Sequence, residues 1–178
     1  MKAAWVMATA GACWCAVSSP SLQASVTLAA AGRSDYVIVL PAAPSPAQTY
    51  AAEELRRFVT AMTGATLTVQ SDREPLPAKA VLLGQTRHTG TVLGAEPDWA
   101  RLGDDGFHLR TVGPHVVVAG GPVRGTLYGV YELLERHGGC RWYASWHSHV
   151  PQRDVWTLPE LDDEQVPAFV MREPFWFD

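Results

Sequence analysis

Apolar residues recur at helical spacing in two segments of the chain, which predicts two amphipathic helices. The first begins at Ser45, a suitable N-cap, with Pro46 in its first turn and Gln48 placed to complete a capping box. Gly64 marks its end, and the second helix occupies residues 123–138. The apolar stripes comprise Ala51, Leu55, Phe58, Val59 and Met62 in the first helix and Leu127, Val130, Tyr131 and Leu134 in the second.

Short alternating or continuous apolar runs predict about six β-strands. Turn residues join the first two strands in an opening hairpin, and Gly113 with Pro114 joins the last two in an antiparallel hairpin. Together with the helices, these strands predict an α/β fold of the α+β type: a two-layer sandwich of a mixed, largely antiparallel sheet with two amphipathic helices on one face. The predicted strands are residues 25–29, 36–40, 66–70, 79–83, 105–111 and 116–119.

The first 24 residues have the parts of a secretory signal peptide. Lys2 gives a positive start, residues 3–17 form an uncharged apolar run, and residues 18–24 are small and suited to cleavage. The run is shorter than the roughly 20 residues that a membrane-spanning helix needs. We therefore expect a secreted or periplasmic protein with no membrane attachment after cleavage; lipidation at Cys13 is the alternative.

Composition narrows the classes of function. The net charge of −4 offers no basic footprint for nucleic acid. Cleavage of the signal would leave Cys140 as the single thiol, so no internal disulfide is expected and the fold must depend on its hydrophobic core. Cys140 lies in an apolar, strand-like run, which predicts a small buried hydrophobe.

The character of the sequence changes after Tyr143. Aromatic residues crowd the last stretch, residues 158–167 form an acidic, proline-containing linker, and a new strand is predicted from Ala168. Such a strand with aromatic residues and nothing to pack on is a poor natural ending. The expected organisation is a signal peptide at 1–24, one domain at 25–165 and the first strand of a further, truncated domain at 166–178.

Two patterns invite a cofactor or metal interpretation, and we favour neither. Residues 118–125 run from a strand through a Gly-rich turn into a helix, but Pro122 stands where a dinucleotide fingerprint needs a glycine. His147 and His149 could ligate a metal, although no third ligand lies at a useful spacing. We therefore expect no cofactor and no metal.

No catalytic set is evident in the sequence. Glycoside hydrolysis needs two carboxylates that face each other across the sugar. Arg124 and Arg141 could each bind a sugar carboxylate, but the plainer interpretation is a salt bridge at the helix start for Arg124 and an interdomain or surface partner for Arg141. The acidic pairs are sequence neighbours expected on solvated surfaces, namely Glu53–Glu54, Asp104–Asp105 and Asp162–Asp163.

Several segments together resemble the N-terminal domain of bacterial α-glucuronidase-like glycoside hydrolases. The similarity extends over residues 26–178, and a related domain precedes the barrel in β-N-acetylhexosaminidases. The segments that carry it are residues 51–55, 63–65, 82–84, 105–107 and, above all, 124–135 followed by 139–143.

The resemblance implies a non-catalytic accessory domain that packs on a catalytic barrel of the same polypeptide, with residues 167–175 entering the first barrel strand. It implies that the parent protein is a glycoside hydrolase acting on a plant or bacterial polysaccharide and that this chain alone is inactive. The residues that would bind substrate or contact the barrel are Arg124, Arg141, Trp142, Trp146 and Trp156.

Two other functions stay open at this point. The chain could be a free-standing carbohydrate-binding module with Trp142, Trp146 and Trp156 as a stacking platform. It could also be a small hydrolase whose carboxylates converge only in the fold.

Overall fold

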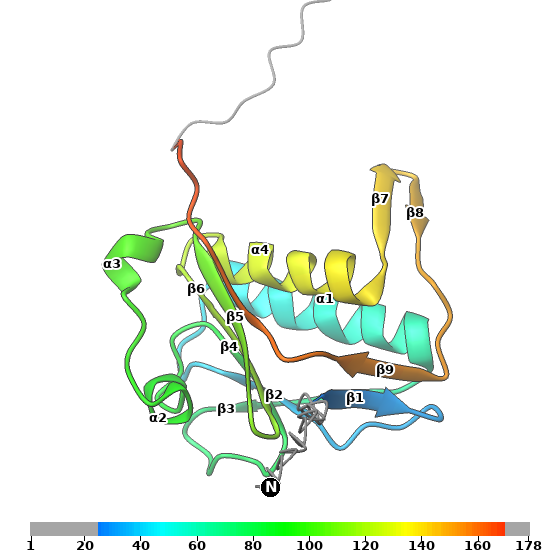
Figure 1. Ribbon diagram of the computed structural model, residues 1–178, viewed down its shortest axis with the longest axis horizontal. Coiled ribbons are helices and arrows are strands. Elements are labelled where there is room, and N and C mark those ends of the chain that lie inside the picture. The colour runs from blue at the N-terminus through cyan, green and yellow to red at the C-terminus, as the bar shows by residue number, and fades with distance from the viewer. Residues whose placement is uncertain (1–24, 170–178) are drawn as a thin grey trace, which may run out of the picture.

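The computed structural model describes residues 25–169, and a mixed six-stranded sheet lies at its centre (Figure 1). Its strands are β2 (Val37–Leu40), β3 (Thr68–Ser71), β4 (Ala80–Leu83), β5 (Phe107–Val112), β6 (His115–Gly120) and β10 (Asp162–Gln165). They lie in the order β10–β5–β6–β4–β2–β3. The two pairings that involve β5 are antiparallel, and the other three are parallel. The predicted mixed α/β sandwich and the β5–β6 hairpin are confirmed.

Two details predicted for the sheet are wrong. The opening strands form no hairpin, because β1 (Val26–Ala30) pairs with β9 (Val155–Leu158), whereas β2 lies between β3 and β4. The sheet is also not largely antiparallel, since three of its five pairings are parallel. The physical reason is visible in β2, whose sequence Val-Ile-Val-Leu has no polar position. A continuous apolar run is typical of a parallel strand that is covered on both faces.

Helix α1 (Pro46–Thr63) has the predicted ends. The Oγ of Ser45 accepts the backbone N–H of Gln48 at 3.2 Å, and the Oε1 of Gln48 accepts the N–H of Ser45 at 2.9 Å. This capping box satisfies two donors that a helix start leaves open. At the other end, Gly64 adopts a φ of 75°, the left-handed conformation that glycine enters without a steric penalty.

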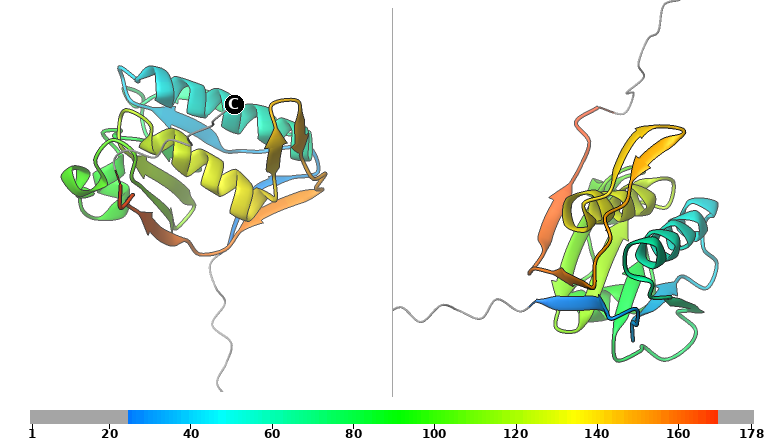
Figure 2. Two further views of the ribbon diagram at one scale, coloured as in Figure 1. Left: turned by 90° about the horizontal axis from the view of Figure 1, so that it is seen from above. Right: turned by 90° about the vertical axis from the view of Figure 1, so that its right-hand side faces the viewer.

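Helix α4 (Gly125–Glu132) continues into a π-helical segment, η1 (Leu133–Gly138). Seen from above in Figure 2, α1 and α4 lie next to each other on one face of the sheet, as predicted. Their apolar sides and the sheet form one core, to which the strands contribute Ile38, Leu40, Val81, Leu83, Val116 and Val118.

The opposite face of the sheet carries two short helices, α2 (Thr89–Leu93) and α3 (Trp99–Leu102). Successive residues of a strand point to opposite faces, so the strands supply a second, smaller core on this side. That core consists of Val39, Ala80, Leu82, Val117 and Ala119, against which Leu76, Val92, Leu93 and Trp99 pack. The sequence did not predict these helices because each is too short to show a helical period.

Two ribbons of two strands lie outside the main sheet. One is the β1–β9 pair, and the other is the hairpin of β7 (Arg141–Ala144) and β8 (His147–His149). The predicted signal peptide, residues 1–24, lies outside the described residues. Of the strand predicted from Ala168, the two described residues are not in a strand, and the remainder lies outside the described part of the chain.

Candidate functional site

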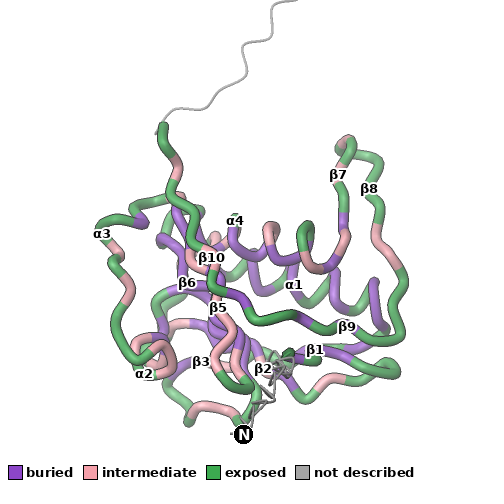
Figure 3. Tube along the Cα trace, viewed as in Figure 1, coloured by how far each residue is buried: buried purple, intermediate pink, exposed green. Residues whose placement is uncertain are grey.

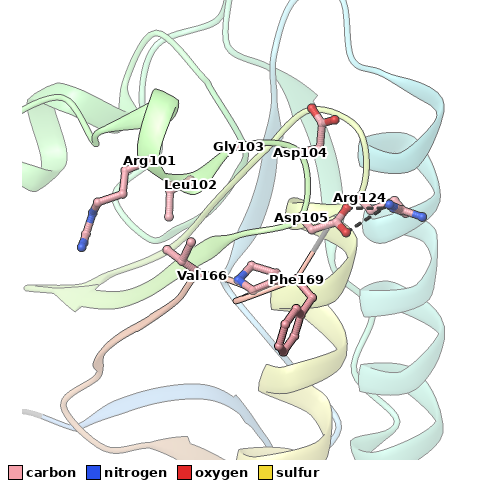
Figure 4. Close-up of a pocket in the computed structure, with 9 residues that line it drawn as sticks. Arg101, Leu102, Gly103, Asp104, Asp105, Arg124, Val166 and Phe169 are labelled. Atoms are coloured by element: carbon pink, nitrogen blue, oxygen red, sulfur yellow. Dashed lines mark hydrogen bonds and ion pairs between the residues drawn. The ribbon is translucent and has the colours of Figure 1, made fainter. Parts of the chain in front are cut away.

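A pocket of about 240 Å³ lies where β6 leads into α4 (Figure 4). Here the guanidinium of Arg124 meets the carboxylate of Asp105 in two hydrogen bonds, Nε to Oδ1 at 2.8 Å and Nη2 to Oδ2 at 3.0 Å. These bonds raise the pKa of Arg124. The two N–H groups of Arg124 that could bind a sugar carboxylate are therefore already bonded to Asp105. The lining comprises Arg101, Leu102, Gly103, Asp104, Asp105, Arg124, Val166, Pro167 and Phe169.

The Gly-rich turn after β6 is bonded to the loop beside it. The N–H groups of Arg124 and Gly125 both donate to the carbonyl oxygen of Asp104, at 3.0 and 2.9 Å. The N–H of Gly121 donates to the carbonyl of Gly106 at 3.1 Å. A phosphate held at a helix start uses such N–H groups, and here they are engaged within the protein. The turn therefore serves to pack β6 and α4 against residues 103–106.

The segment after β10 passes beside this pocket. Val166 and Phe169 both line it and are 44% and 72% exposed. These residues come from the end of the described chain, next to the start of α4 (Figure 4). The pocket thus marks the place where the chain leaves the domain.

Arg141 lies at the base of the β7–β8 hairpin. Its Nη1 donates to the carbonyl oxygens of Glu135 and Cys140, each at 2.7 Å, and is 4.0 Å from Oε1 of Glu135. The side chain thus bonds to one carbonyl within η1 and to one just beyond its end, as basic residues near helix C-termini do. In this arrangement Arg141 fixes the hairpin to the helix end.

Trp142, the next residue, is half-buried and packs edge-on against two aromatic rings. Its ring centroid lies 5.2 Å from that of Phe58 and 5.0 Å from that of Tyr131, with interplanar angles of 79° and 82°. T-shaped packing of this kind stabilises aromatic pairs beyond the area they bury. Trp142 is therefore a second anchor of the hairpin base.

A buried carboxylate that the sequence analysis placed on a solvated surface lies under this aromatic cluster. Glu54 is 5% exposed and accepts hydrogen bonds from the hydroxyl of Tyr131 at 2.8 Å and from Arg57 at 2.9 and 2.8 Å. Burial and the neighbouring carboxylate raise the pKa of Tyr131. The polar group at position 54, on the edge of the apolar stripe, was the sequence signal for a partner on the second helix.

Trp156, one of the predicted binding or contact residues, is buried, so its ring is not available at the surface of this domain. Its side chain is 0% exposed in β9, and its indole N–H donates to the carbonyl oxygen of His137 at 3.0 Å. The reason is strand alternation: Trp156 and Leu158 face the core, while Val155 and Thr157 face solvent. The proposed platform of three tryptophans therefore does not exist on the surface of this domain.

Trp146 occupies the turn at the tip of the hairpin and is 87% exposed. Tyr143, which the sequence analysis missed, is 66% exposed and stacks on His147 with 5.6 Å between ring centroids and an interplanar angle of 24°. Its position next to Trp142 in an alternating strand was the available signal, since neighbours in a strand point to opposite sides.

Among the remaining candidates, Asp162 and Cys140 have partners within the domain. Within residues 25–169, no group of three His, Cys, Asp or Glu side chains could hold a metal ion, and His147 and His149 are exposed on β8. Asp162 accepts a hydrogen bond from Nε2 of His108 at 2.7 Å, which lowers the pKa of Asp162. Cys140 is buried as predicted, with its Sγ 3.7 Å from the sulfur of Met62, and burial raises the pKa of the thiol.

Comparisons with known proteins agree with this architecture. A 4-O-methyl-α-glucuronidase of family GH115 with specificity for decorated arabinogalactans has a TM-score of 0.56 at 20% identity, over 80% of this chain and 18% of its own. The protein CpGH84D has a TM-score of 0.51 at 15% identity, over 80% of this chain and 21% of its own. At these identities the likeness concerns the fold.

Sequence relatives carry the comparison further. A probable α-glucuronidase A of Aspergillus terreus is 33% identical over 118 residues, and α-glucuronidase A of Emericella nidulans is 32% identical over 87. These matches cover 57% and 48% of this chain but 14% and 10% of the fungal proteins. The family described as the glycosyl hydrolase family 67 N-terminus matches residues 23–133. The chain therefore belongs to the glycosyl hydrolase family 67 N-terminal domain family.

Proposed function

We propose that residues 25–165 form a non-catalytic accessory domain that supports the catalytic barrel of an α-glucuronidase-like glycoside hydrolase. The observation that carries this proposal is the family match to an N-terminal region, with 14% of a fungal α-glucuronidase covered by the chain. The chain-exit segment beside the Asp105–Arg124 pocket provides the connection, and residues 166–178 would lead into the barrel. The barrel is the proposed partner, and a glucuronic acid-bearing polysaccharide the proposed substrate.

The coding sequence beyond Asp178 gives the first test. We expect an uninterrupted frame of several hundred residues with alternating strand and helix patterns, because a barrel of this kind takes about 250 residues. A stop codon directly after Asp178 in intact genomic sequence would contradict the proposal.

The second test compares the full-length polypeptide with one that lacks residues 25–165. We expect the deletion to lower the soluble yield, the midpoint of thermal unfolding or the release of glucuronic acid from glucuronoxylan fragments. The 178-residue chain alone should release no product from these fragments or from aryl glucuronides. Hydrolysis by the isolated chain would favour the small-hydrolase alternative.

We also propose that the protein is exported, on the strength of the charged start, apolar run and small residues of segment 1–24. Across residues 25–169, no helix combines the length and hydrophobicity that a membrane span requires. Expression with its natural N-terminus, followed by N-terminal sequencing of the exported product, tests this. Recovery of the uncut chain in the cytoplasm would contradict it, and a lipid on Cys13 would show the alternative route.

Carbohydrate binding is the second candidate function. Since Trp156 is buried, fewer aromatic rings are available to stack on a sugar than the sequence predicted. The observation that favours it is the exposed pair Trp146 and Tyr143, 87% and 66% exposed at one hairpin tip. Aromatic faces of this kind can stack on sugar rings. Calorimetric titration of the 178-residue chain with glucuronoxylan fragments, alongside Trp146→Ala, decides it: a flat titration of the folded chain excludes binding to these sugars.

A further inference from the structure

The β7–β8 hairpin, residues 141–149, is held firmly at its base and is called the arm below. On the side where the chain enters it, Arg141 bonds to the end of η1, and Trp142 packs on α1 and α4. Just after the arm, the Nε2 of Gln152 donates to the carbonyl oxygen of Ala61 at 2.8 Å. The backbone N–H of Arg153 donates to the carbonyl oxygen of Met62 at 2.7 Å. The direction of the arm is therefore fixed by both of its ends.

Beyond this base the arm is open to solvent. All three residues of β8 are exposed, and so are Tyr143 and Trp146 (Figure 3). An isolated two-stranded hairpin is marginally stable in water. An aromatic side chain can bury roughly 150–250 Å² in a contact, so a partner surface would stabilise the arm. Because its base is fixed, the arm would lose little conformational freedom when its exposed aromatic side chains bind a partner.

The chemistry of the arm favours a protein surface over a sugar. Sugar sites combine an aromatic face with polar groups that fix the hydroxyls. Residues 141–149 contain no Asp, Glu, Asn or Gln, and Tyr143 already covers one ring face by stacking on His147. Arg141 is engaged at the base of the arm, so the polar rings left for a partner are the exposed His147 and His149, whose ring N–H groups can donate to acidic or carbonyl groups around an apolar recess.

The location of the arm indicates which protein surface it would contact. In Figure 1 the hairpin tip and residues 166–169 both rise above the helix layer, on the side away from β1 and β3 and at opposite ends of that layer, and Figure 2 agrees. Phe169 is 72% exposed at that exit. A domain attached there is presented to the arm at a high effective concentration.

We propose that the arm docks on the domain that follows residue 178 in the full-length polypeptide, with Trp146 and Tyr143 seated in an apolar recess rimmed by carboxylates. This inference rests on the proposed accessory function and names the surface that carries it out.

Hydrogen exchange of the arm amides tests this docking. Exchange of peptides from residues 141–149 is measured by mass spectrometry in the full-length polypeptide and in the 178-residue chain. We expect these amides to exchange at least about tenfold more slowly in the full-length polypeptide. Trp146→Ala should return the exchange to the faster rate. Val69→Thr, a matched change at an exposed apolar position on edge strand β3, should leave it slow.

Three results would overturn the proposal. Equal exchange in the two polypeptides would show that the following domain does not cover the arm. Slowing in the 178-residue chain as its concentration rises would assign the arm to a second copy, and slowing on addition of glucuronoxylan fragments would assign it to sugar. If deletion of residues 25–165 impairs the enzyme while arm exchange is unchanged, the accessory function stands and the docking surface is wrong.

Discussion

The β1–β9 ribbon and the β7–β8 ribbon are both short antiparallel pairs outside the main sheet, but the first buries one of its faces and the second has no buried residue (Figure 3). Each contributes a tryptophan that appeared equivalent in the sequence. Trp156 of β9 is 0% exposed, whereas Trp146 at the β7–β8 turn is 87% exposed. The first ribbon completes the domain's own core, and the second projects from it.

The tryptophans of one aromatic-rich segment, residues 142–156, therefore differ in role: some pack in the core and another is exposed. Alternation along β9 turns Trp156 inward, onto the carbonyl of His137 at the end of the helix layer. In the hairpin, one strand position places Trp142 against α1 and α4, and the turn carries Trp146 away from them. Burial is decided by strand register and by what lies opposite, residue by residue.

Replacing the buried tryptophan should have the largest effect. We expect Trp156→Ala to lower the free energy of unfolding of the 178-residue chain by about 3–5 kcal/mol, because it leaves a large cavity and an unpaired carbonyl. Urea unfolding followed by circular dichroism measures this. Trp146→Ala is the matched control, with an expected change within about 0.5 kcal/mol. Equal losses of stability for the two variants would contradict the claim that one ribbon belongs to the core and the other does not.

Replacing the buried carboxylate of Glu54 should have the second-largest effect on the free energy of unfolding. Glu54→Ala removes the acceptor of the Tyr131 hydroxyl and should cost about 1–3 kcal/mol in the same unfolding measurement. The control is Glu53→Ala, a change at the neighbouring exposed position. A double-mutant cycle with Tyr131→Phe isolates the bond. Additive effects of the two substitutions would show that it makes no contribution.

A smaller loss is expected at the start of β7. Arg141→Ala removes two hydrogen bonds to carbonyl groups, but the side chain is 46% exposed and water replaces part of what is lost. We expect a cost of about 0.5–1 kcal/mol and faster amide exchange in residues 142–149. Arg136→Ala, which removes exposed ion pairs instead, should not alter that exchange. Unchanged exchange in Arg141→Ala would refute its anchoring role.

The end of η1, to which Trp156 of the buried ribbon bonds, should impose a weak pH dependence on stability. Burial and Arg136 lower the pKa of His137, while Asp163 and Glu132 oppose the shift. The unfolded chain then binds more protons, so stability is complete above a pH of about 6.5, the ordinary pKa of His, and declines as the pH falls below it. His115 shifts in the same direction, so His137→Asn should flatten only part of the slope. An unaltered slope would show that His137 makes no contribution.

Local signals predicted much of this fold. The Ser45–Gln48 capping box, the left-handed Gly64 and the β5–β6 hairpin were all correct, because each depends on residues close in sequence. The pairing of β1 with β9 depends on residues about 130 positions apart. No local pattern encodes such a pairing, and a short turn between β1 and β2 favoured the wrong hairpin.

The candidate site was less predictable. Arg124 has the salt bridge that was the plainer interpretation, whereas the carbonyl partners of Arg141 were not predicted. The burial of Glu54 required knowledge of where Tyr131 lies on the second helix. The three tryptophans could not be separated either, because their exposure depends on strand register and on the long-range packing of β9.

The most direct test of the account compares Trp146→Ala in the 178-residue chain and in the full-length polypeptide by scanning calorimetry. In the isolated chain the side chain is 87% exposed, and the substitution should leave the midpoint of unfolding unchanged. In the full-length polypeptide we expect the midpoint to fall by roughly 2–8 °C, corresponding to a loss of about 1–2 kcal/mol at the domain contact. An unchanged midpoint in both would contradict the claim that the exposed ribbon serves a partner domain.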